Sequence, residues 1–361
     1  MKILVGVNHP KHVLLFKNTV DNLMNEGHEV KIVAVEKEIT EYLLERFNMP
    51  YTLIGVNQQG LYRKGIALLG WEYRTYRIAK EFKPDIFVGR ALPHLAHVSA
   101  VLNKPFIIFE DTEHATVAQK ICLPFTDAVV TPDCYMRDFG KKHVRFNGYY
   151  ELAYLHPNYF KPDPSVLDDL GLRRDDNFII LRFVSWGATH DICQHGIKNK
   201  MELVRKLDKY GRVLITSEGV LNTKLEKYKI KISPEKLHDL LYYASLYIGE
   251  GGTMATESAV LGTHAIHIST TAKYCGIFYD LNKYDLMWIS DAENGAIGKV
   301  VEILQKNNIK KEGKRKREKL LKDKIDVTAF MIKFMEIYPE SLKIMKKNPN
   351  YQDRFRLRRS L

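Results

Sequence analysis

Several features that would place this sequence in a membrane or outside the cell are missing. No apolar run approaches the roughly 18–20 residues that a membrane-spanning helix needs, and residues 1–10 follow a strand-and-turn pattern, not that of a signal peptide. The four cysteines stand singly and form no CxxC pair. We therefore expect free thiols and a cytoplasmic protein, with peripheral binding at the inner face of the membrane as a further possibility.

Two common phosphate-binding motifs are also missing. The dinucleotide-binding pattern GxGxxG and the phosphate-loop pattern GxxxxGK[ST] do not occur, which argues against redox and ATPase functions. Nothing resembles a helix-turn-helix, a zinc finger or an RNA-binding signature, so we expect no sequence-specific recognition of nucleic acid. Hydrophobic residues make up 45% of the 361 residues and charged residues 27%, which is the composition of a folded globular protein.

Positive charge is concentrated near the C-terminal end. The net charge is +12, and +10 of it comes from residues 310–361, which hold 17 Lys and Arg against 7 Asp and Glu. A basic segment of this kind suits an anionic membrane surface or an acidic polymer. The alternative is a solvated helix face followed by a frayed tail.

Short β-branched runs alternate with amphipathic stretches, which is the rhythm of a parallel sheet covered by helices. We expect a first series of strands at 2–7, 29–35, 51–54, 85–89, 105–109 and 127–130. Helices of this series are expected at 13–25, 62–82 and 94–102. A second series predicts strands at 178–183, 213–216, 246–249 and 265–268. Its helices are expected at 198–209, 234–243, 253–261, 296–305 and 314–338.

A tyrosine-rich stretch interrupted by three prolines between positions 157 and 164 separates the two series. The fold class is therefore α/β, with two Rossmann-like domains facing each other across a cleft and helices at the C-terminal end. The cleft would lie at the carboxyl ends of the strands, where open α/β sheets bind ligands. The expected parts are a first domain at 1–150, a linker at 151–175, a second domain at 176–310 and basic helices with a tail at 311–361.

The most specific local pattern is the run of residues 248–262, in which glycines follow a predicted strand and precede a predicted helix. Backbone N–H groups at such a helix start, with the helix dipole, attract an anion. Gly251 and Gly252 would let a phosphate approach the backbone, and Thr253 would add a hydroxyl. Glu257 is suited to accept from the vicinal hydroxyls of a ribose. The pattern predicts a nucleoside diphosphate site; the alternative is a plain turn with Glu257 exposed.

Two carboxylates and a histidine follow the apolar strand expected at 105–109. Glu110, Asp111 and His114 would stand at the carboxyl end of that strand, where general acid–base chemistry needs such groups. A reaction in which a hydroxyl attacks requires a base that takes its proton, and each of the three is a candidate. The alternative is that Asp111 or Thr112 caps a helix at 113–121.

The loop after the strand at 178–183 is expected to carry further contacts to the ligand. The candidates there are Arg182, Ser185, Trp186 and His190. Arg182 is suited to bind a diphosphate through two parallel hydrogen bonds, and Trp186 to stack on a base or sugar. His190 is a catalytic candidate, or else a loop histidine bonded to a neighbouring aspartate. Glu218 is a weaker candidate for the nucleobase or ribose.

The loop after the first strand and the helix that follows carry His9, His12 and Lys17. The HxxH spacing suggests a metal, but no third ligand of fixed geometry accompanies it, so we expect none. Uncharged polar contacts or a helix-capping role fit the histidines better. Lys17 is placed either to approach a phosphate or to be solvated. Arg90, after the strand at 85–89, is a further candidate for substrate binding.

Residues 248–264 resemble the nucleotide-sugar motif of GT-B glycosyltransferases, notably the lipid-linked N-acetylglucosamine transferase of peptidoglycan synthesis. They also resemble the matching stretch of the non-hydrolysing UDP-N-acetylglucosamine 2-epimerases. More of the chain resembles an archaeal and bacterial domain-of-unknown-function family of predicted GT-B glycosyltransferases. Its matching stretches are 9–17, 110–115, 147–157, 182–191 and 248–264. The resemblance implies a GT-B fold and a nucleotide-sugar ligand, guessed to be a UDP-sugar.

Three functions are left open. The first is a glycosyltransferase that needs no metal and no cofactor, because no Asp-x-Asp stands at a predicted strand end. The second is a 2-epimerase, for which the resemblance implies roles for Glu110 and His190. In that family a carboxylate follows the strand that ends here at Gly89, but this sequence has Arg90. The third is a non-catalytic protein that binds a nucleotide sugar or a polyanion.

Overall fold

The computed structural model describes residues 1–58, 60–184, 197, 199–217, 219, 221–270, 272–291 and 293–357. It divides the chain into two compact units. The first unit comprises residues 1–159 together with the chain from residue 324 onward, and the second comprises residues 160–323. Each has its own parallel sheet, as the βα rhythm of the sequence predicts.

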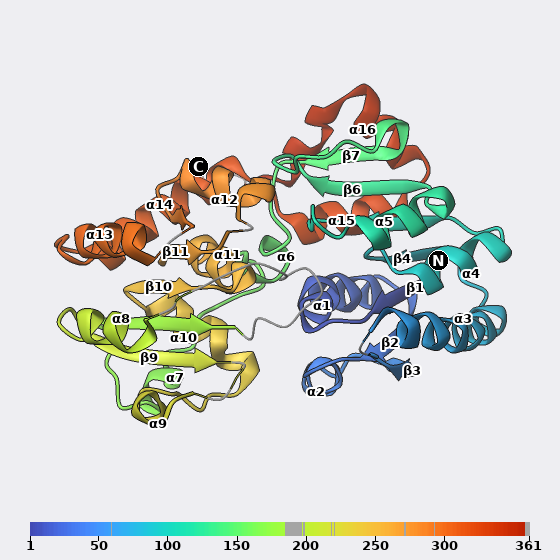
Figure 1. The fold of residues 1–361 in the computed structure, drawn as a ribbon. Helices are drawn as coiled ribbons and strands as arrows, with labels where there is room; N and C mark the ends of the chain where they lie inside the picture. Colours follow the sequence, from blue (N-terminus) through green and yellow to red (C-terminus); the bar gives the residue numbers. More distant parts are fainter. Residues whose placement is uncertain are drawn as a thin grey trace. The chain divides into compact units, whose positions relative to one another are not determined.

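The first unit is built on a seven-stranded parallel sheet with the order β3-β2-β1-β4-β5-β6-β7 (Figure 1). Its strands are β1 (Lys2–Val7), β2 (Glu29–Glu36), β3 (Tyr51–Val56), β4 (Ile86–Gly89), β5 (Phe106–Phe109), β6 (Ala128–Pro132) and β7 (His143–Phe146). The strand order reverses between β1 and β4, so the loops after these two strands diverge. Ligands bind at such a reversal in open α/β sheets.

Helices cover both faces of this sheet. On one face α3 and α4 pack against strand residues such as Leu4 and Phe106, and on the other α1, α6 and α15 contact one another. The helices of this unit are α1 (Pro10–Asn25), α2 (Thr40–Arg46), α3 (Leu61–Phe82), α4 (Pro93–Val101), α5 (Thr116–Cys122), α6 (Leu152–Leu155), α15 (Val327–Glu336) and α16 (Glu340–Lys347). Short 3₁₀ turns lie at Leu123–Phe125, Gly140–Lys142 and Pro349–Phe355.

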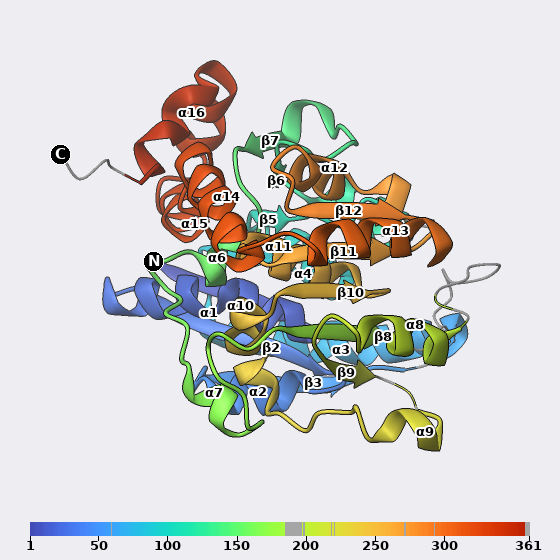
Figure 2. The ribbon, with the colours of Figure 1, turned by 90° about the vertical axis from the view of Figure 1, so that its left-hand side faces the viewer.

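The second unit has a five-stranded parallel sheet with the order β12-β11-β10-β8-β9 (Figure 2). Its strands are β8 (Phe178–Phe183), β9 (Arg212–Ser217), β10 (Leu246–Gly249), β11 (His264–Ile268) and β12 (Met287–Ser290). The order reverses between β8 and β10. Apolar side chains of α8 and α13, such as Leu203 and Val300, pack on the strands in one buried cluster.

The helices of the second unit connect these strands. They are α7 (Ser165–Asp168), α8 (Lys200–Leu207), α9 (Thr223–Glu226), α10 (Leu237–Tyr243), α11 (Gly252–Val260), α12 (Gly276–Asn282), α13 (Glu293–Leu304) and α14 (Ile309–Asp323). Two 3₁₀ turns lie at Pro234–Lys236 and Ala272–Tyr274. Among the described residues, no helix combines the length and the apolar character needed to cross a bilayer.

The expected strands are confirmed to within two residues at each end, whereas the helix expected at 314–338 is wrong. That segment forms two helices, α14 and α15, because residues 324–326 are drawn into other contacts. The Ile325 N–H donates to the Asn147 carbonyl, and the Asp326 N–H donates to the Phe355 carbonyl. The Asp326 side chain then caps α15 by accepting from the Ala329 N–H at 3.0 Å.

The frayed tail considered for the C-terminal end is also wrong over its described part. Residues up to 355 fold into α16 and a 3₁₀ turn within the first unit. Met345 is buried, and the buried Gln352 side chain accepts a hydrogen bond of 2.6 Å from the Asn147 N–H. The segment is therefore a structural part of that unit.

Candidate functional site

In the second unit, a glycine-rich turn joins the carboxyl end of β10 to the start of α11. A Cβ atom at Gly249 would lie 2.6 Å from Tyr247 Oη and 2.7 Å from Arg182 Cβ, and one at Gly252 would lie 2.9 Å from Phe278 Cζ. Both positions therefore exclude a side chain. Gly251 is different, because a Cβ there would meet no atom closer than 3.5 Å. The packing of the turn thus explains two glycines but not Gly251, where the contact between a ligand and the backbone stays a prediction.

The start of α11 is open to solvent. Gly251 and Gly252 are half-buried and Thr253 is exposed. Gly251 occupies the N-cap position, where no side chain accepts a hydrogen bond from the helix. The first N–H groups of a helix have no partner within the helix, and the helix dipole makes this end positive. The turn can therefore receive an anionic group such as a phosphate.

Arg182 and Glu250 flank this turn. Arg182 lies on β8 directly opposite Gly249 of β10, and its side chain is half-buried. Glu250 is 5% exposed, and its carboxylate accepts hydrogen bonds from the Val184 N–H at 2.9 Å and from the Ile197 N–H at 2.6 Å. Glu250 thus joins the residues on either side of positions 185–196. Ser185, Trp186 and His190 fall in that interval and, like Glu218, lie outside the described residues.

Glu250 was not among the site residues predicted from the sequence. The available signal was a carboxylate inside a run of glycines, immediately after a strand at the reversal point of the sheet. We assigned roles to the glycines around it and none to the acid. Its two backbone partners are 66 and 53 residues away along the chain, so no local pattern indicates them.

Glu257 lies on α11 one turn beyond Thr253, but it is buried. It is 3% exposed, and its Oε1 lies 3.1 Å from Nε2 of His238 on α10. The alternative of an exposed Glu257 is therefore wrong. The contact between Glu257 and a ribose stays a prediction. A ribose bound there would share the Glu257 carboxylate with His238.

In the first unit, charged side chains meet at the carboxyl edge of the sheet. Arg90, which follows β4, donates from Nη2 to Glu110 Oε1 at 2.5 Å, to Thr112 Oγ1 at 2.9 Å and to the Asp111 carboxylate. Lys11, in the first turn of α1, donates to Asp111 Oδ2 at 2.9 Å and lies 3.2 Å from Glu151 Oε1. The segments that follow β1, β4, β5 and β7 thus contribute side chains to one buried ion network.

This network engages both carboxylates that the sequence proposes as bases. Burial would raise the pKa of Asp111, but Arg90 and Lys11 bring that pKa far below its usual range. Glu110 accepts at Oε1 from Arg90 and from the N–H groups of Asp111 and Thr112. Glu110 held in this way orders the loop, and its Oε1 is already engaged by three donors. The helix-cap alternative for Asp111 or Thr112 is wrong, because α5 has Ala115 at its N-cap and no side-chain cap.

The two histidines at the start of α1 differ in role. His9 is the N-cap residue of α1, and its Nδ1 accepts from the Lys11 N–H at 3.1 Å, so the capping role is confirmed. His12 is half-buried, and the Asn8 N–H donates to its Nδ1 at 3.4 Å. Burial, and then the positive charge of Arg90, lower the pKa of His12 well below its usual value. His12 is therefore neutral near pH 7.

The structure does not bring the other two candidates of this unit into the network. The Lys17 ammonium lies 4.1 Å from the centre of the Phe47 ring, beyond the end of α2, and burial lowers its pKa. His114 is exposed in the turn between β5 and α5. The binding role of Lys17 and the catalytic role of His114 both stay predictions.

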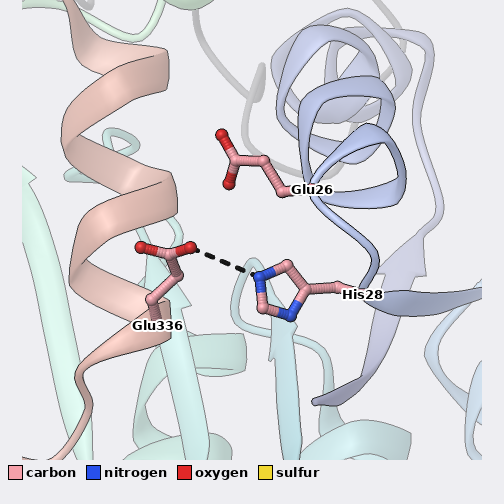
Figure 3. A group of neighbouring side chains, drawn as sticks. All are labelled: Glu26, His28 and Glu336. Atoms are coloured by element: carbon pink, nitrogen blue, oxygen red, sulfur yellow. Dashed lines mark hydrogen bonds and ion pairs between the residues drawn. The ribbon is translucent and has the colours of Figure 1, made fainter.

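One cluster in the first unit has the composition of a metal site. Glu26, His28 and Glu336 offer ligand atoms that lie within 4.8 Å of one another (Figure 3). His28 Nε2 is 3.3 Å from Glu336 Oε1, and its Nδ1 is 3.1 Å from the N-terminal amine. His28 precedes β2, so the cluster lies at the amino edge of the sheet, opposite the ion network. We interpret the contact between His28 and Glu336 as a hydrogen bond that joins α15 to the loop before β2.

Comparisons with known proteins agree with this architecture. A family model described as "Protein of unknown function (DUF354)" matches residues 1–335. An uncharacterized protein of Methanocaldococcus jannaschii is 24% identical over 298 residues, which cover 79% of this chain and 85% of that protein. The resemblance to a family of unknown function, drawn from the sequence, is thereby confirmed.

Two solved structures are similar in fold. The SsfS6 glycosyltransferase of Streptomyces sp. SF2575, complexed with thymidine diphosphate, superposes with a TM-score of 0.59 at 15% identity over 92% of this chain and 99% of that one. The UDP-GlcNAc 2-epimerase from Methanocaldococcus jannaschii, in complex with UDP-GlcNAc and UDP, gives 0.60 at 12% identity over 87% and 98%. At such identities the likeness shows the fold, which is of the GT-B type.

Proposed function

We propose that this chain, which belongs to the DUF354 family of unknown function, transfers a glycosyl group from a nucleoside-diphosphate sugar without a metal ion. The observation that carries the proposal is the open start of α11. Its first N–H groups, which have no partner within the helix, its partly exposed glycines and the neighbouring Arg182 are suited to bind an anion at the carboxyl edge of the second sheet. A nucleoside diphosphate is bound by the glycosyltransferase and by the epimerase of similar fold.

The chemistry needs stabilisation of the leaving group and removal of one proton. The acceptor oxygen attacks the anomeric carbon, and the bond from that carbon to the diphosphate oxygen breaks. The departing diphosphate gains negative charge, which the N–H groups of α11 and the Arg182 guanidinium are suited to stabilise. The proton of the acceptor hydroxyl goes to a base. This division of labour requires no divalent cation.

We assign the base to His12 in place of the carboxylates proposed from the sequence. Asp111 is locked between Arg90 and Lys11, and Glu110 already accepts three hydrogen bonds through one oxygen. His12 is neutral, half-buried and next to this network. The neutral imidazole can accept the proton at its unprotonated Nδ1, in exchange for the 3.4 Å hydrogen bond from the Asn8 N–H, and Asp111 offsets part of the positive charge that builds up there.

The nucleobase and the acceptor are finer parts of the proposal. We propose uridine, supported by the UDP-GlcNAc and UDP bound to the epimerase of similar fold. We also propose peripheral association with an anionic membrane at its inner face. That part is supported by the lysines of α16, of which Lys346 and Lys347 are exposed, because each basic group near an anionic surface adds attraction.

A 2-epimerase is the second candidate, because the epimerase of similar fold fits as well as the glycosyltransferase. Against it, Arg90 stands where that mechanism needs a carboxylate, and Arg90 is bonded to Glu110. Incubation of the protein with UDP-N-acetylglucosamine in deuterated water separates the two functions. We expect no deuterium at C2 of the sugar; deuterium incorporation there would establish the epimerase.

Nucleotide binding is tested by thermal unfolding of the full chain with UDP, thymidine diphosphate, UMP and UDP-sugars. We expect a bound diphosphate to raise the midpoint by mass action. The variant Thr253→Asp puts a negative charge at the start of α11 and is expected to abolish the rise. Thr223→Asp is the matched control, because Thr223 is an exposed threonine at the start of another helix of the same unit. A rise that persists in Thr253→Asp would refute this site.

A further inference from the structure

The second unit has another hollow at the opposite edge of its sheet. Its volume is about 850 Å³, and it is lined by Asn177, Tyr210 and Ser245, the residues just before β8, β9 and β10. These residues mark the amino ends of the strands, whereas the start of α11 lies at the carboxyl ends. The hollow is therefore separate from the proposed nucleotide-sugar site.

The wall of this hollow is strongly basic. The end of α13, the loop after it and the start of α14 supply most of the charge, and the segment before β8 supplies the rest. The charged residues of the lining are Arg174, Asp175, Lys306, Lys310, Lys311 and Lys314. Five of these six carry positive charge. Lys310, Lys311 and Lys314 belong to the basic segment at 310–361 that was noted in the sequence. The proposed function assigns no role to these three lysines.

Lys310 is held at the centre of this wall. Its Nζ donates to the carbonyls of Asp176 at 2.7 Å and Arg174 at 3.0 Å, which directs the ammonium group toward the segment before β8. Burial, together with the nearby charge of Lys314, lowers its pKa to about 8. The carboxyl groups of Asp175 and Asp176 oppose this shift without cancelling it. A further negative charge in the hollow would relieve the repulsion.

The helix that carries these lysines adds to the positive potential. Lys310 and Lys311 stand in the first turn of α14, where the helix dipole is already positive and basic residues are unfavourable. Glu312 is the acid of that turn, and it pairs with Lys316 at 2.6 Å and Lys306 at 3.4 Å. The charge of the first turn is therefore not neutralised within α14, and an anion in the hollow would complement both the lysines and the helix end.

Aromatic and neutral polar groups complete the lining. The Lys314 ammonium and the Arg317 guanidinium lie over the Tyr242 ring, at 5.2 and 5.8 Å from its centre. The lining also includes Tyr243 and the amide side chains of Asn307 and Asn308. Hollows of about 300–1,000 Å³ hold small-molecule ligands in proteins, so this one has room for more than a single phosphate ion.

We propose that this hollow is a second ligand site, which binds the phosphate groups of a phosphorylated small molecule or of an anionic lipid headgroup. Lys310, Lys311 and Lys314 contact the phosphate oxygens, and the tyrosine rings and asparagine amides contact the remainder of the ligand. The site does not depend on the glycosyltransferase assignment. It gives the protein a means of binding a phosphorylated compound while the start of α11 is occupied.

Titration calorimetry with inorganic pyrophosphate tests the site in the full chain carrying Thr253→Asp, which removes the contribution of α11. We expect one binding event, weakened at least tenfold by Lys310→Gln with Lys314→Gln. The control is Lys319→Gln with Lys322→Gln, two exposed lysines of the same helix outside the lining. If the first pair impairs folding, Lys311→Glu with Lys314→Glu replaces it, because both side chains are exposed. Equal weakening by the control pair, or no binding at all, would overturn the proposal.

Vesicles distinguish the two sources of phosphate. Sedimentation with phosphatidylglycerol and with phosphatidylcholine vesicles is measured for the same variants. Binding to phosphatidylglycerol that is weakened both by pyrophosphate and by Lys310→Gln with Lys314→Gln identifies a lipid headgroup. Pyrophosphate binding with vesicle binding that is absent, or that neither change affects, identifies a soluble ligand; unaffected vesicle binding is assigned to the lysines of α16. Pyrophosphate is titrated into a chain in which α11 is altered, so that experiment does not depend on the nucleotide-sugar site. Failure of UDP to bind the unaltered chain would therefore count against the proposed function alone.

Discussion

Replacing Arg90 by methionine removes the centre of the ion network in the first unit and leaves its shape largely filled. Arg90 is 6% exposed and Glu110 is 2% exposed, so the charges that meet here are screened little by water. The variant deprives Glu110, Asp111 and Thr112 of their shared donor in one step. Lys11 still pairs with Asp111. Glu110 Oε1, in contrast, loses its hydrogen bond from the charged guanidinium, and no other charged group replaces it.

The expected loss follows from that uncompensated charge. Removal of one partner from a buried ion pair typically destabilises a protein by about 3–5 kcal/mol. Lys11 retains part of the stabilisation, and the N–H groups of Asp111 and Thr112 still bond to Glu110. We therefore expect the free energy of unfolding of the first unit to fall by about 3 kcal/mol at neutral pH, the lower end of that range.

The same loss has a defined dependence on pH. In the unaltered protein the pKa of Asp111 is far below its usual value, so its ionised form stabilises the fold above about pH 4. That stabilisation is lost only as the pH falls through the low folded-state pKa. Without Arg90, burial raises the pKa and Lys11 alone opposes it, so the variant takes up a proton at higher pH. The difference in stability between the two proteins should therefore shrink as the pH falls from 7 towards about 4.

Urea unfolding followed by circular dichroism at several pH values measures both effects. Arg63→Met is the matched control, since Arg63 is exposed on α3, and its change should stay within about 0.5 kcal/mol. A loss below about 1 kcal/mol for Arg90→Met, or a loss that grows as the pH falls, would refute the account of this network.

Two further substitutions test the assigned groups. His12→Asn should lower kcat by about 10²–10⁴-fold with little change in KM for the nucleotide sugar. It should also displace the acidic limb of the pH–rate profile. In the unaltered protein this limb lies below pH 6.5, because the pKa of His12 is lowered. Loss of activity in His114→Asn with His12→Asn unaffected would exclude His12 as the base. Glu250→Gln leaves one of two buried N–H groups without an acceptor, which should cost about 1–3 kcal/mol and weaken UDP binding. Glu302→Gln, at an exposed ion pair, should change neither stability nor binding, and equal effects of the two substitutions would exclude the anchoring role of Glu250.

The sequence predicts the edges at which functional groups gather better than the pairs that they form. Parallel strands read as short β-branched runs, and the groups after them necessarily meet at one sheet edge, so the location of Glu110 and Arg90 follows from the pattern. Their pairing does not, because Arg90 is 20 residues from Glu110 and Lys11 is 100 residues from Asp111. Only the folded arrangement shows that these carboxylates are engaged, and this is the reason why we propose His12 as the base in their place.

For the basic C-terminal segment, composition predicts the charge but not where the fold places that charge. The sequence predicted one part of basic helices with a tail at 311–361, but the break between α14 and α15 divides this segment between the two units. The lysines of α14 line a hollow in the second unit, whereas the residues after 340 pack in the first, where Gln352 bonds to the Asn147 N–H. Deleting residues 341–361 would remove the buried Met345 along with the charge. Charge-changing substitutions of exposed lysines, not truncation, are therefore the means to separate anion binding from folding.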